Sequence, residues 1–254
     1  MLRSRIIPCL LVRNKGLVKT VQFKDSKYVG DPINAVKIFN EKEVDELIVL
    51  DIDATKEKRE PDFKMIENLA NESRMPLCYG GGVKTVEHAK QIIHLGAEKV
   101  ALSSAAIESP NLVVDIAKAV GVQSVIVVLD VKKKGLFGKY QVYIHNGTKA
   151  TGIDPKELAV QFEKLGVGEI VINSIDNDGM MKGYDLKLID LVRSAINIPM
   201  TVLGGAGELT HIKEIIKKYK VIGVAAGSLF VFKGKYKAVL INYPNRAEIK
   251  ELLK

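Results

Sequence analysis

The chain has 254 residues, of which 47% are hydrophobic and 27% charged, and its formal net charge is +8 at pH 7. This length suits one large α/β domain or two small ones. Its apolar runs are too short for a secretory signal or a membrane span, so we expect a cytoplasmic protein. Most lysines share helix faces with glutamates, and only 6% of residues are aromatic, which indicates a solvated surface and no nucleic-acid site.

Cysteines and histidines give no sign of a metal site. Cys9 and Cys78 each lie inside an apolar, strand-like run, which predicts buried free thiols. The four histidines are scattered, without the spacing that transition-metal ligands require. We therefore expect neither a metal nor another cofactor.

Short apolar runs alternate with amphipathic helical stretches along the whole chain. Predicted helices cover residues 31–41, 86–97 and 154–167, the last with Asp154 as N-cap and Pro155 in the first turn. Near-continuous apolar strands between helices predict parallel strands buried on both faces. The predicted strands are 5–11, 46–52, 75–80, 98–103, 124–130, 169–175, 199–204 and 221–227.

Eight such units predict an α/β protein with one (β/α)8 TIM barrel over residues 1–254. An open doubly wound sheet is the main alternative, but the G-x-G-x-x-G turn usual after its first strand is missing. Residues 14–25 instead predict a small hairpin on the rim of the barrel.

A faint internal repeat, offset by about 120–125 residues, supports a barrel of two halves. The predicted halves are about 1–120 and 121–254. The recurring strand ends are 9–12 with 128–131, 50–53 with 174–178, 79–83 with 203–207, and 100–106 with 223–229.

Glycine clusters at residues 80–82 and 204–207 follow the third and seventh strands. Backbone without side chains can approach an anion and turn its N–H groups toward it, so these loops predict two phosphate sites. The loops after the next strands add hydroxyl groups and a helix N-terminus. Tight turns needed only for packing are the alternative. The predicted phosphate-binding residues are Gly81, Gly82, Ser103, Ser104, Gly204, Gly205, Ala226, Gly227 and Ser228.

Carboxylates stand at the C-terminal ends of three predicted strands. Asp130 ends the fifth strand, where a carboxylate faces the substrate of a barrel enzyme and can act as acid or base. For Asp51 and Asp176 we favour a supporting or capping role. Lys19, on the rim hairpin, could reach a phosphate or could simply be an exposed lysine.

Four charged residues stand at the opposite, N-terminal ends of the predicted strands. Their alternating signs predict a ring of ion pairs that closes the bottom of the barrel, although each alone is an ordinary surface charge or salt bridge. They are Arg5, Glu46, Lys99 and Glu169.

Taken together, these motifs resemble the cyclase subunit of imidazole glycerol phosphate synthase, the HisF family of histidine biosynthesis. The resemblance runs almost from end to end of the chain. It is carried by residues 5–10, 30–32, 45–52, 79–83, 97–110, 151–155, 176–186 and 203–207.

The resemblance implies two phosphate sites for a long bis-phosphorylated ribonucleotide, with Asp178 and Gly179 also binding substrate. It implies a HisH-like glutaminase on the N-terminal face of the barrel, forming a heterodimer. It further implies that Arg5, Glu46, Lys99 and Glu169 form the gate through which ammonia enters the barrel.

The family's catalytic pair is an aspartate after strand 1 and another after strand 5. Asp130 matches the second, but Leu11 stands where the first is expected. Leucine can neither donate nor accept a proton, and losing such a group typically costs about two to four orders of magnitude in rate. The other departures from the family pattern are Ser103, Asn173, Met180 and Leu203.

Three hypotheses follow. A divergent paralogue would receive ammonia from the glutaminase and pass it to a separate sugar amidotransferase. A genuine cyclase would replace the missing acid with water or another side chain. The related isomerase barrel of the same pathway, which needs no glutaminase, is the third.

Overall fold

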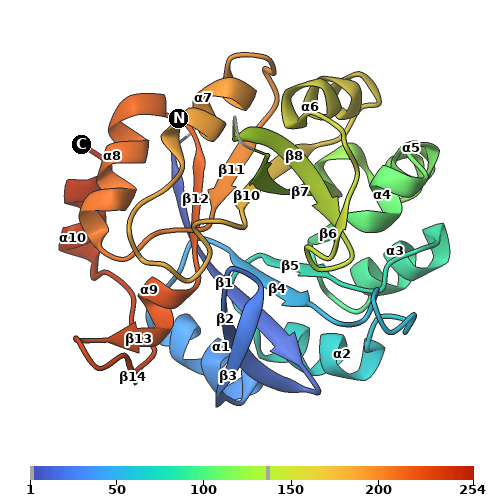
Figure 1. Cartoon of the computed structure of the whole chain (residues 1–254). Coiled ribbons are helices and arrows are strands. Elements are labelled where there is room, and N and C mark those ends of the chain that lie inside the picture. The colour runs from blue at the N-terminus through green and yellow to red at the C-terminus, as the bar shows by residue number, and fades with distance from the viewer. Residues whose placement is uncertain (1–2, 136–137) are drawn as a thin grey trace.

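Eight parallel strands close into a barrel in the computed structural model, which describes residues 3–135 and 138–254. β1 pairs with β4 on one side and β12 on the other, and the β7–β10 pairing closes the ring (Figure 1). The α/β TIM barrel predicted from the sequence is thus confirmed. The barrel strands are β1 (Arg5–Arg13), β4 (Leu47–Asp51), β5 (Leu77–Gly80), β6 (Lys99–Leu102), β7 (Val125–Lys134), β10 (Glu169–Ser174), β11 (Met200–Leu203) and β12 (Gly223–Ala226).

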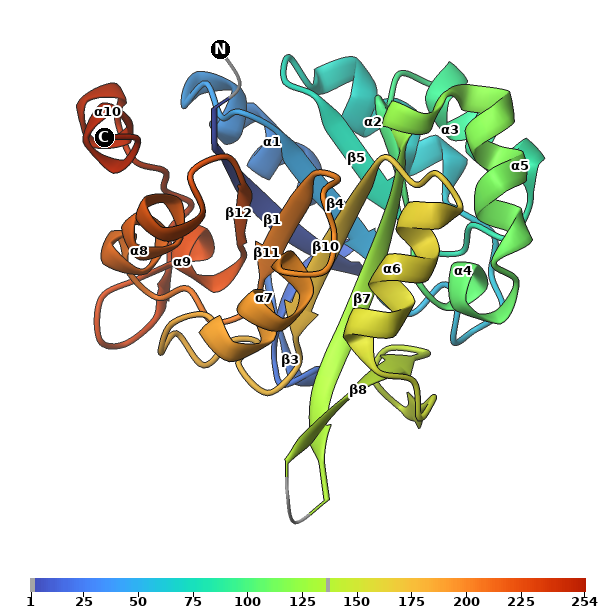
Figure 2. The ribbon, with the colours of Figure 1, turned by 90° about the horizontal axis from the view of Figure 1, so that it is seen from above.

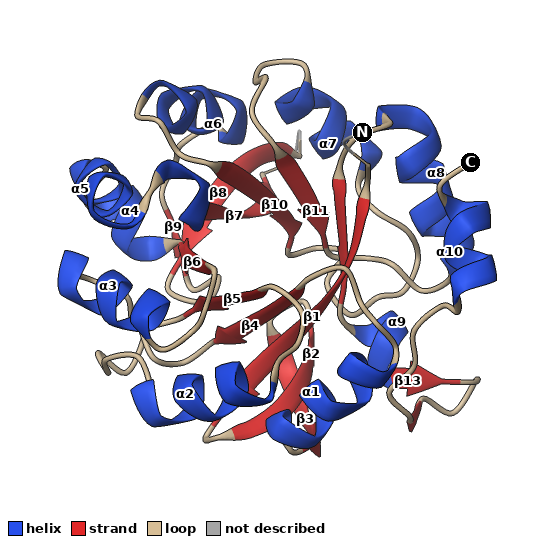
Figure 3. Cartoon of the chain, turned by 180° about the vertical axis from the view of Figure 1, so that it is seen from behind, coloured by secondary structure: helices blue, strands red, loops and turns tan. Residues whose placement is uncertain are grey.

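Helices surround the barrel on all sides (Figure 3). Within residues 3–135 and 138–254, no helix has the length and apolar character needed to cross a membrane. The helices are α1 (Pro32–Glu41), α2 (Phe63–Glu72), α3 (Val86–His94), α4 (Ser104–Glu108), α5 (Asn111–Val120), α6 (Pro155–Lys164), α7 (Leu186–Arg193), α8 (Leu209–Tyr219), α9 (Ser228–Val231) and α10 (Arg246–Leu252), with a 3-10 turn at Val122–Ser124.

Local signals set where these helices begin and end. The Asp154 side chain accepts backbone N–H groups at the start of α6, and Pro155 occupies the first turn, as predicted. Helices α3 and α6 stop a few residues before their predicted ends. The chain reverses there at Gly96 (φ 106°) and Gly166 (φ 82°), a conformation that glycine adopts readily.

Strand residues alternate between two separate hydrophobic cores. On β1, Ile6 and Leu10 pack outward against the helices, whereas Ile7 and Cys9 point into the barrel. Both cysteines belong to the inner core as free, buried thiols, as predicted. Its members are Ile7, Cys9, Ile48, Cys78, Ala101, Ile126, Val128, Val171, Leu203 and Ala225.

Three hairpins extend the chain beyond the barrel. The predicted rim hairpin exists but lies later, as β2 (Gly16–Val21) and β3 (Lys24–Gly30). The sequence reading ended the fifth strand at residue 130, but β7 continues into a hairpin with β8 (Lys139–Ile144) that projects from the end of the barrel opposite the N-terminus (Figure 2). The other strands outside the barrel are β9 (Lys149–Ala150), β13 (Phe232–Lys233) and β14 (Ala238–Val239).

Strand ends that recur in the sequence lie opposite one another in the barrel. The order around the ring is β1, β4, β5, β6, β7, β10, β11, β12. Four positions therefore separate β5 from β11 and β6 from β12, so the two glycine clusters face each other. The division of the chain into two halves at about residue 120 stays a prediction.

A substitution in the outer core tests this packing. Phe162 on α6 is fully buried between helix and barrel. Phe162→Ala should lower the free energy of unfolding by about 3–5 kcal/mol because it leaves a cavity. Lys156→Ala, on the exposed face of the same helix, should change it by less than about 0.5 kcal/mol. Urea unfolding followed by circular dichroism measures both; similar effects would contradict the assigned orientation of α6.

Candidate functional site

A pocket opens at the C-terminal ends of the barrel strands, and all the predicted substrate-side residues line it. The structure thus brings together positions from six barrel strands, their loops and the rim hairpin. These residues are Lys19, Gly81, Gly82, Ser103, Ser104, Asp130, Asp178, Gly179, Gly204, Gly205, Ala226, Gly227 and Ser228.

The glycine loops have conformations and neighbours that only glycine tolerates. Gly81 (φ 118°) and Gly205 (φ 117°) have positive φ angles. A Cβ atom would lie 2.4 Å from the Asp51 carbonyl oxygen at Gly81, and 2.1 Å from the Gly183 carbonyl oxygen at Gly205. These neighbours are protein backbone, so packing alone already requires the glycines. Phosphate binding by the two loops stays a prediction.

Lys19 is the cation within the pocket. The side chain is buried, and its Nζ donates a hydrogen bond to the Cys9 carbonyl oxygen at 2.6 Å. A Cβ atom on Gly227 would lie 2.5 Å from this Nζ, which places the amine at the loop after β12. Burial lowers the pKa of Lys19. The alternative of an exposed surface lysine is therefore wrong.

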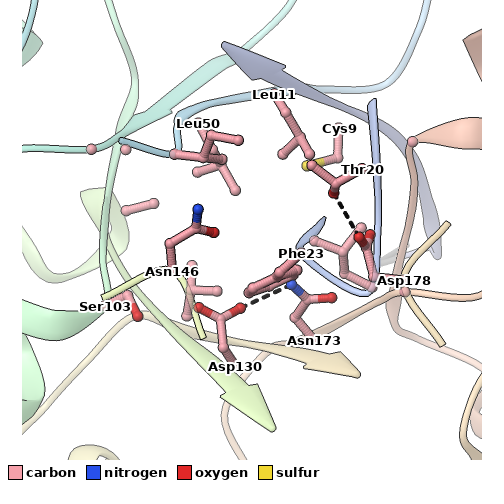
Figure 4. A pocket seen from close by; sticks show the side chains of 18 of the residues that line it. Cys9, Leu11, Thr20, Phe23, Leu50, Ser103, Asp130, Asn146, Asn173 and Asp178 are labelled. Atoms are coloured by element: carbon pink, nitrogen blue, oxygen red, sulfur yellow. Dashed lines mark hydrogen bonds between the residues drawn. The ribbon is translucent and has the colours of Figure 1, made fainter. Parts of the chain in front are cut away.

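Asp130 is held by a neighbouring amide at the point where β7 leaves the barrel and pairs with β8. Asn173 Nδ2, on β10, donates to Asp130 Oδ1 at 2.9 Å (Figure 4). Burial raises the pKa of Asp130 to about 7, with the Asn173 hydrogen bond opposing the shift and the Asp178 charge adding to it. The group can therefore exchange a proton near neutral pH, as an acid or base must.

Across the pocket from Asp130, the described residues form an apolar wall. Leu11 and Leu50 occupy the opposite wall, and Leu203 also lines the cavity (Figure 4). The nearby acid Asp178 accepts a hydrogen bond from Thr20 Oγ1 at 2.8 Å, and burial raises its pKa. The pocket thus places Asp130 opposite an apolar wall, with Asp178 beside it and bonded to Thr20.

Sequence reasoning missed several lining residues. Thr20 and Phe23 come from the rim hairpin and Asn146 from the turn after β8, two elements whose contacts the periodicity does not reveal. Met180, singled out as a departure from the family pattern, is not among the residues that line the pocket.

Asp51 and Asp176 take the supporting roles expected of them. Asp51 accepts the backbone N–H groups of residues 53 and 54 and pairs with Arg59 at 3.0 Å. Asp176 Oδ2 accepts the Lys133 N–H at 2.9 Å and so holds the start of the β7–β8 hairpin.

Four charges form a closed ring of ion pairs at the other end of the barrel. Lys99 Nζ lies 2.7 Å from Glu46 Oε1 and 3.1 Å from Glu169 Oε2. Arg5 completes the ring, pairing with Glu169 at 2.6 Å and also with Glu46. Both glutamates are buried, so the two positive charges offset them where water cannot. The four residues meet as the sequence predicted.

The ring and the pocket lie at opposite ends of the apolar inner core. Arg5, Glu46, Lys99 and Glu169 stand at or beside the first residues of their strands, whereas the glycine loops follow the last residues of theirs and Asp130 lies beside them. The core between the two ends consists mostly of apolar side chains and the two cysteine thiols, with the buried Thr201 beside the ring.

Comparison with known proteins identifies the family. Residues 5–237 match the family model described as "Histidine biosynthesis protein". A protein of Vibrio vulnificus (strain YJ016) named "Putative imidazole glycerol phosphate synthase subunit hisF3" is 57% identical over 253 residues, covering 100% of this chain and 97% of that protein. The chain belongs to the HisF family.

Other HisF relatives differ in their similarity to the chain. "Putative imidazole glycerol phosphate synthase subunit hisF2" of Pseudomonas aeruginosa is 51% identical over 245 residues, covering 96% of this chain and 97% of that protein. "Imidazole glycerol phosphate synthase subunit HisF" of Lactococcus lactis subsp. cremoris (strain SK11) is 43% identical over 230 residues, covering 91% and 89%. These names do not favour the isomerase hypothesis.

The ion-pair ring should make stability depend on pH. Burial acts to raise the pKa of Glu169, but the attraction of Arg5 and Lys99 outweighs it and holds that pKa below its ordinary value. The ionised carboxylate therefore stabilises the fold above about pH 4.5, and this contribution is lost as the pH falls through the lower folded pKa. Glu169→Gln should cost about 3 kcal/mol at pH 7.

Urea unfolding at a series of pH values measures this effect. The gap in the free energy of unfolding between wild type and Glu169→Gln should shrink as the pH falls below about 4.5, whereas the exposed control Glu157→Gln should show almost no gap at any pH. A gap that stays constant down to pH 3 would show that the pairing does not depend on the Glu169 charge.

Asp130 should titrate near neutral pH. Carbon-13 NMR of aspartate-labelled protein should show one carboxyl group with a midpoint of about 7, absent in Asp130→Asn. Asn173→Leu should raise the midpoint, because the lost hydrogen bond favours the charged form. Ionisation is disfavoured in the folded state, so the Asp130 contribution to stability should fall as the pH rises from about 4 to about 7. A midpoint near 4 would contradict the burial of this group.

Proposed function

We propose that the chain is the barrel subunit of a glutamine-dependent complex that receives ammonia from a glutaminase and passes it on to a separate sugar amidotransferase. The main support for this proposal is the contrast between the two ends of the barrel. The N-terminal end holds a complete ring of four paired charges, whereas Leu11 faces Asp130 at the C-terminal end.

The inner core suits neutral ammonia. A full charge costs several kcal/mol to bury among apolar side chains, so the core would admit ammonia and exclude ammonium. Lys99 is the flexible member of the ring, a single ammonium group on a four-carbon stem. Its displacement toward one glutamate would open a passage beside it.

The apolar wall of the pocket argues against ordinary cyclase chemistry. Two carboxyl groups with separated pKa values divide acid and base roles. Here Leu11 can serve in neither role, and Asp178 is engaged by Thr20. Asp130 alone would supply proton transfer.

The names of the relatives also fit a paralogue. The relatives at 51–57% identity, whether numbered (hisF3, hisF2) or unnumbered (the HisF of Leptospira interrogans), all bear names that begin with "Putative", whereas the HisF of Lactococcus lactis, at 43%, does not. A glutaminase resembling HisH would bind the N-terminal face as a heterodimer, beside the ring.

A genuine cyclase is the second candidate. Asp130, Lys19 and both glycine loops are in place around one pocket, and the relatives bear the name of imidazole glycerol phosphate synthase. Under this reading, water or Asp178 would supply the missing acid.

An activity assay with ammonium salts separates the two candidates. The purified chain should convert the bis-phosphorylated ribonucleotide to imidazole glycerol phosphate about 10²–10⁴-fold more slowly than the HisF of Lactococcus lactis, because one acid–base group is missing. Leu11→Asp should raise the rate, whereas Leu11→Asn, of similar size but unable to ionise, should not. An ordinary rate in the unmodified chain would overturn the proposed function.

A further inference from the structure

The chain exposes an unusual apolar surface on its last hairpin, β13–β14. Among the residues that the structure describes, six large hydrophobic residues are exposed, and three of these lie within residues 236–240. Tyr236 is 91% exposed, Leu240 49% and Val239 44%. We call Tyr236, Val239 and Leu240 the hairpin patch. A cluster of this kind indicates a surface that another molecule covers.

The hairpin patch is held rigidly beside the pocket. The Leu240 N–H donates to the Val231 carbonyl oxygen, and the Asn242 N–H donates to the Phe230 carbonyl oxygen, each at 2.9 Å. These bonds fix the segment after the hairpin against α9. Helix α9 begins at Ser228, which lines the pocket, so the hairpin that follows α9 leaves from the same end of the barrel. A surface fixed in advance loses little entropy when it binds.

The charges around the patch specify the chemistry of its partner. Lys233, Lys235 and Lys237 alternate along the hairpin, and within the described ranges none forms an ion pair with an acidic side chain. Lys27 of the rim hairpin extends this basic surface, its Nζ lying 5.6 Å from the centre of the Phe232 ring. An acidic protein surface would complement these lysines.

A second copy of the chain would fit poorly on this patch. A two-fold dimer brings the same surface of both copies together, so the lysines would face one another. Nucleic acid also fits less well, because Tyr236 is the patch residue that offers a ring for base stacking, whereas Val239 and Leu240 offer neither a ring nor a charge.

The patch also lies partly beyond the common family region. The family model ends at residue 237, so Val239 and Leu240 fall outside it, whereas the relative from Vibrio vulnificus aligns over 100% of this chain.

We infer that the hairpin patch docks an acidic face of the enzyme that accepts the ammonia. This inference rests on the proposed function, in which ammonia leaves at this end of the barrel. The glutaminase would bind beside the ring at the opposite end, so both partners fit at once.

Site-specific crosslinking followed by quantitative binding tests the inference. The full chain, with a photo-crosslinking amino acid in place of Tyr236, is expressed in its own organism, and the crosslinked protein is identified and purified. This purified protein is the binding probe. We expect it to carry out glutamine-dependent amination with the chain and its glutaminase. Its Kd should weaken at least tenfold in Lys235→Glu/Lys237→Glu and in Val239→Ser/Leu240→Ser.

The matched control changes the other basic hairpin at the same end. Lys134→Glu/Lys139→Glu on β7–β8 reverses two exposed charges away from the patch and should leave the Kd within twofold. Crosslinking only to a second copy, to nucleic acid or to nothing would overturn the inference, as would equal effects of the two charge reversals. The ammonium assay on Leu11 variants is independent of these results, so failure of the docking and failure of the proposed function remain distinguishable.

Discussion

The Arg5, Glu46, Lys99 and Glu169 side chains hold one another at the N-terminal end of the barrel, and the interior above them depends on that pairing. Each glutamate bonds both cations and each cation bonds both glutamates, so the buried charges sum to zero. An unpaired charge here would draw water toward Ile7, Ile48 and the other inner residues. Thr201 Oγ1 strengthens the arrangement by donating to Glu169 Oε1 at 2.5 Å.

Closing a barrel with buried ion pairs contributes little free energy to its stability. Desolvation offsets most of the attraction within buried ion pairs, and apolar residues of similar volume often serve stability as well or better. The TIM barrel tolerates apolar packing throughout, as the inner core of this chain demonstrates. Four paired charges in this position therefore fit a functional role better than a structural one, which is consistent with the proposed entry of ammonia.

The pocket end has the opposite character. Burial raises the pKa of Asp130 to about 7, which destabilises the folded protein at neutral pH. A barrel that only carried ammonia would gain stability from an apolar residue there. We therefore propose that Asp130 keeps a function, either binding a ligand or exchanging a proton with that ligand. This holds although Leu11 and Leu50 face Asp130 across the cavity.

The sequence predicted what depends on strand order and missed what depends on loops. The apolar periodicity and the length of each run predicted the eight strands. In a parallel barrel all strands begin at one end and finish at the other, so the sequence also predicted that Arg5 and Glu169 lie at one end and Gly81 and Gly205 at the other. The burial of Lys19 was not predictable, since it depends on how the rim hairpin folds over Cys9. Thr20, Phe23 and Asn146 were missed for the same reason. The β7–β8 hairpin was missed because Lys132, Lys133 and Lys134 interrupt the apolar run of β7, although Tyr140, Val142 and Ile144 on β8 do alternate with other side chains.

Genetic complementation tests the central claim most directly, which is that the chain carries ammonia and does not make imidazole glycerol phosphate. A bacterial strain that lacks its own cyclase subunit gene is supplied with this chain and grown without histidine on high ammonium. We expect no growth with the unmodified chain although the folded protein is present. We expect growth with the HisF of Lactococcus lactis. Growth with the unmodified chain at the rate of that control would contradict the account.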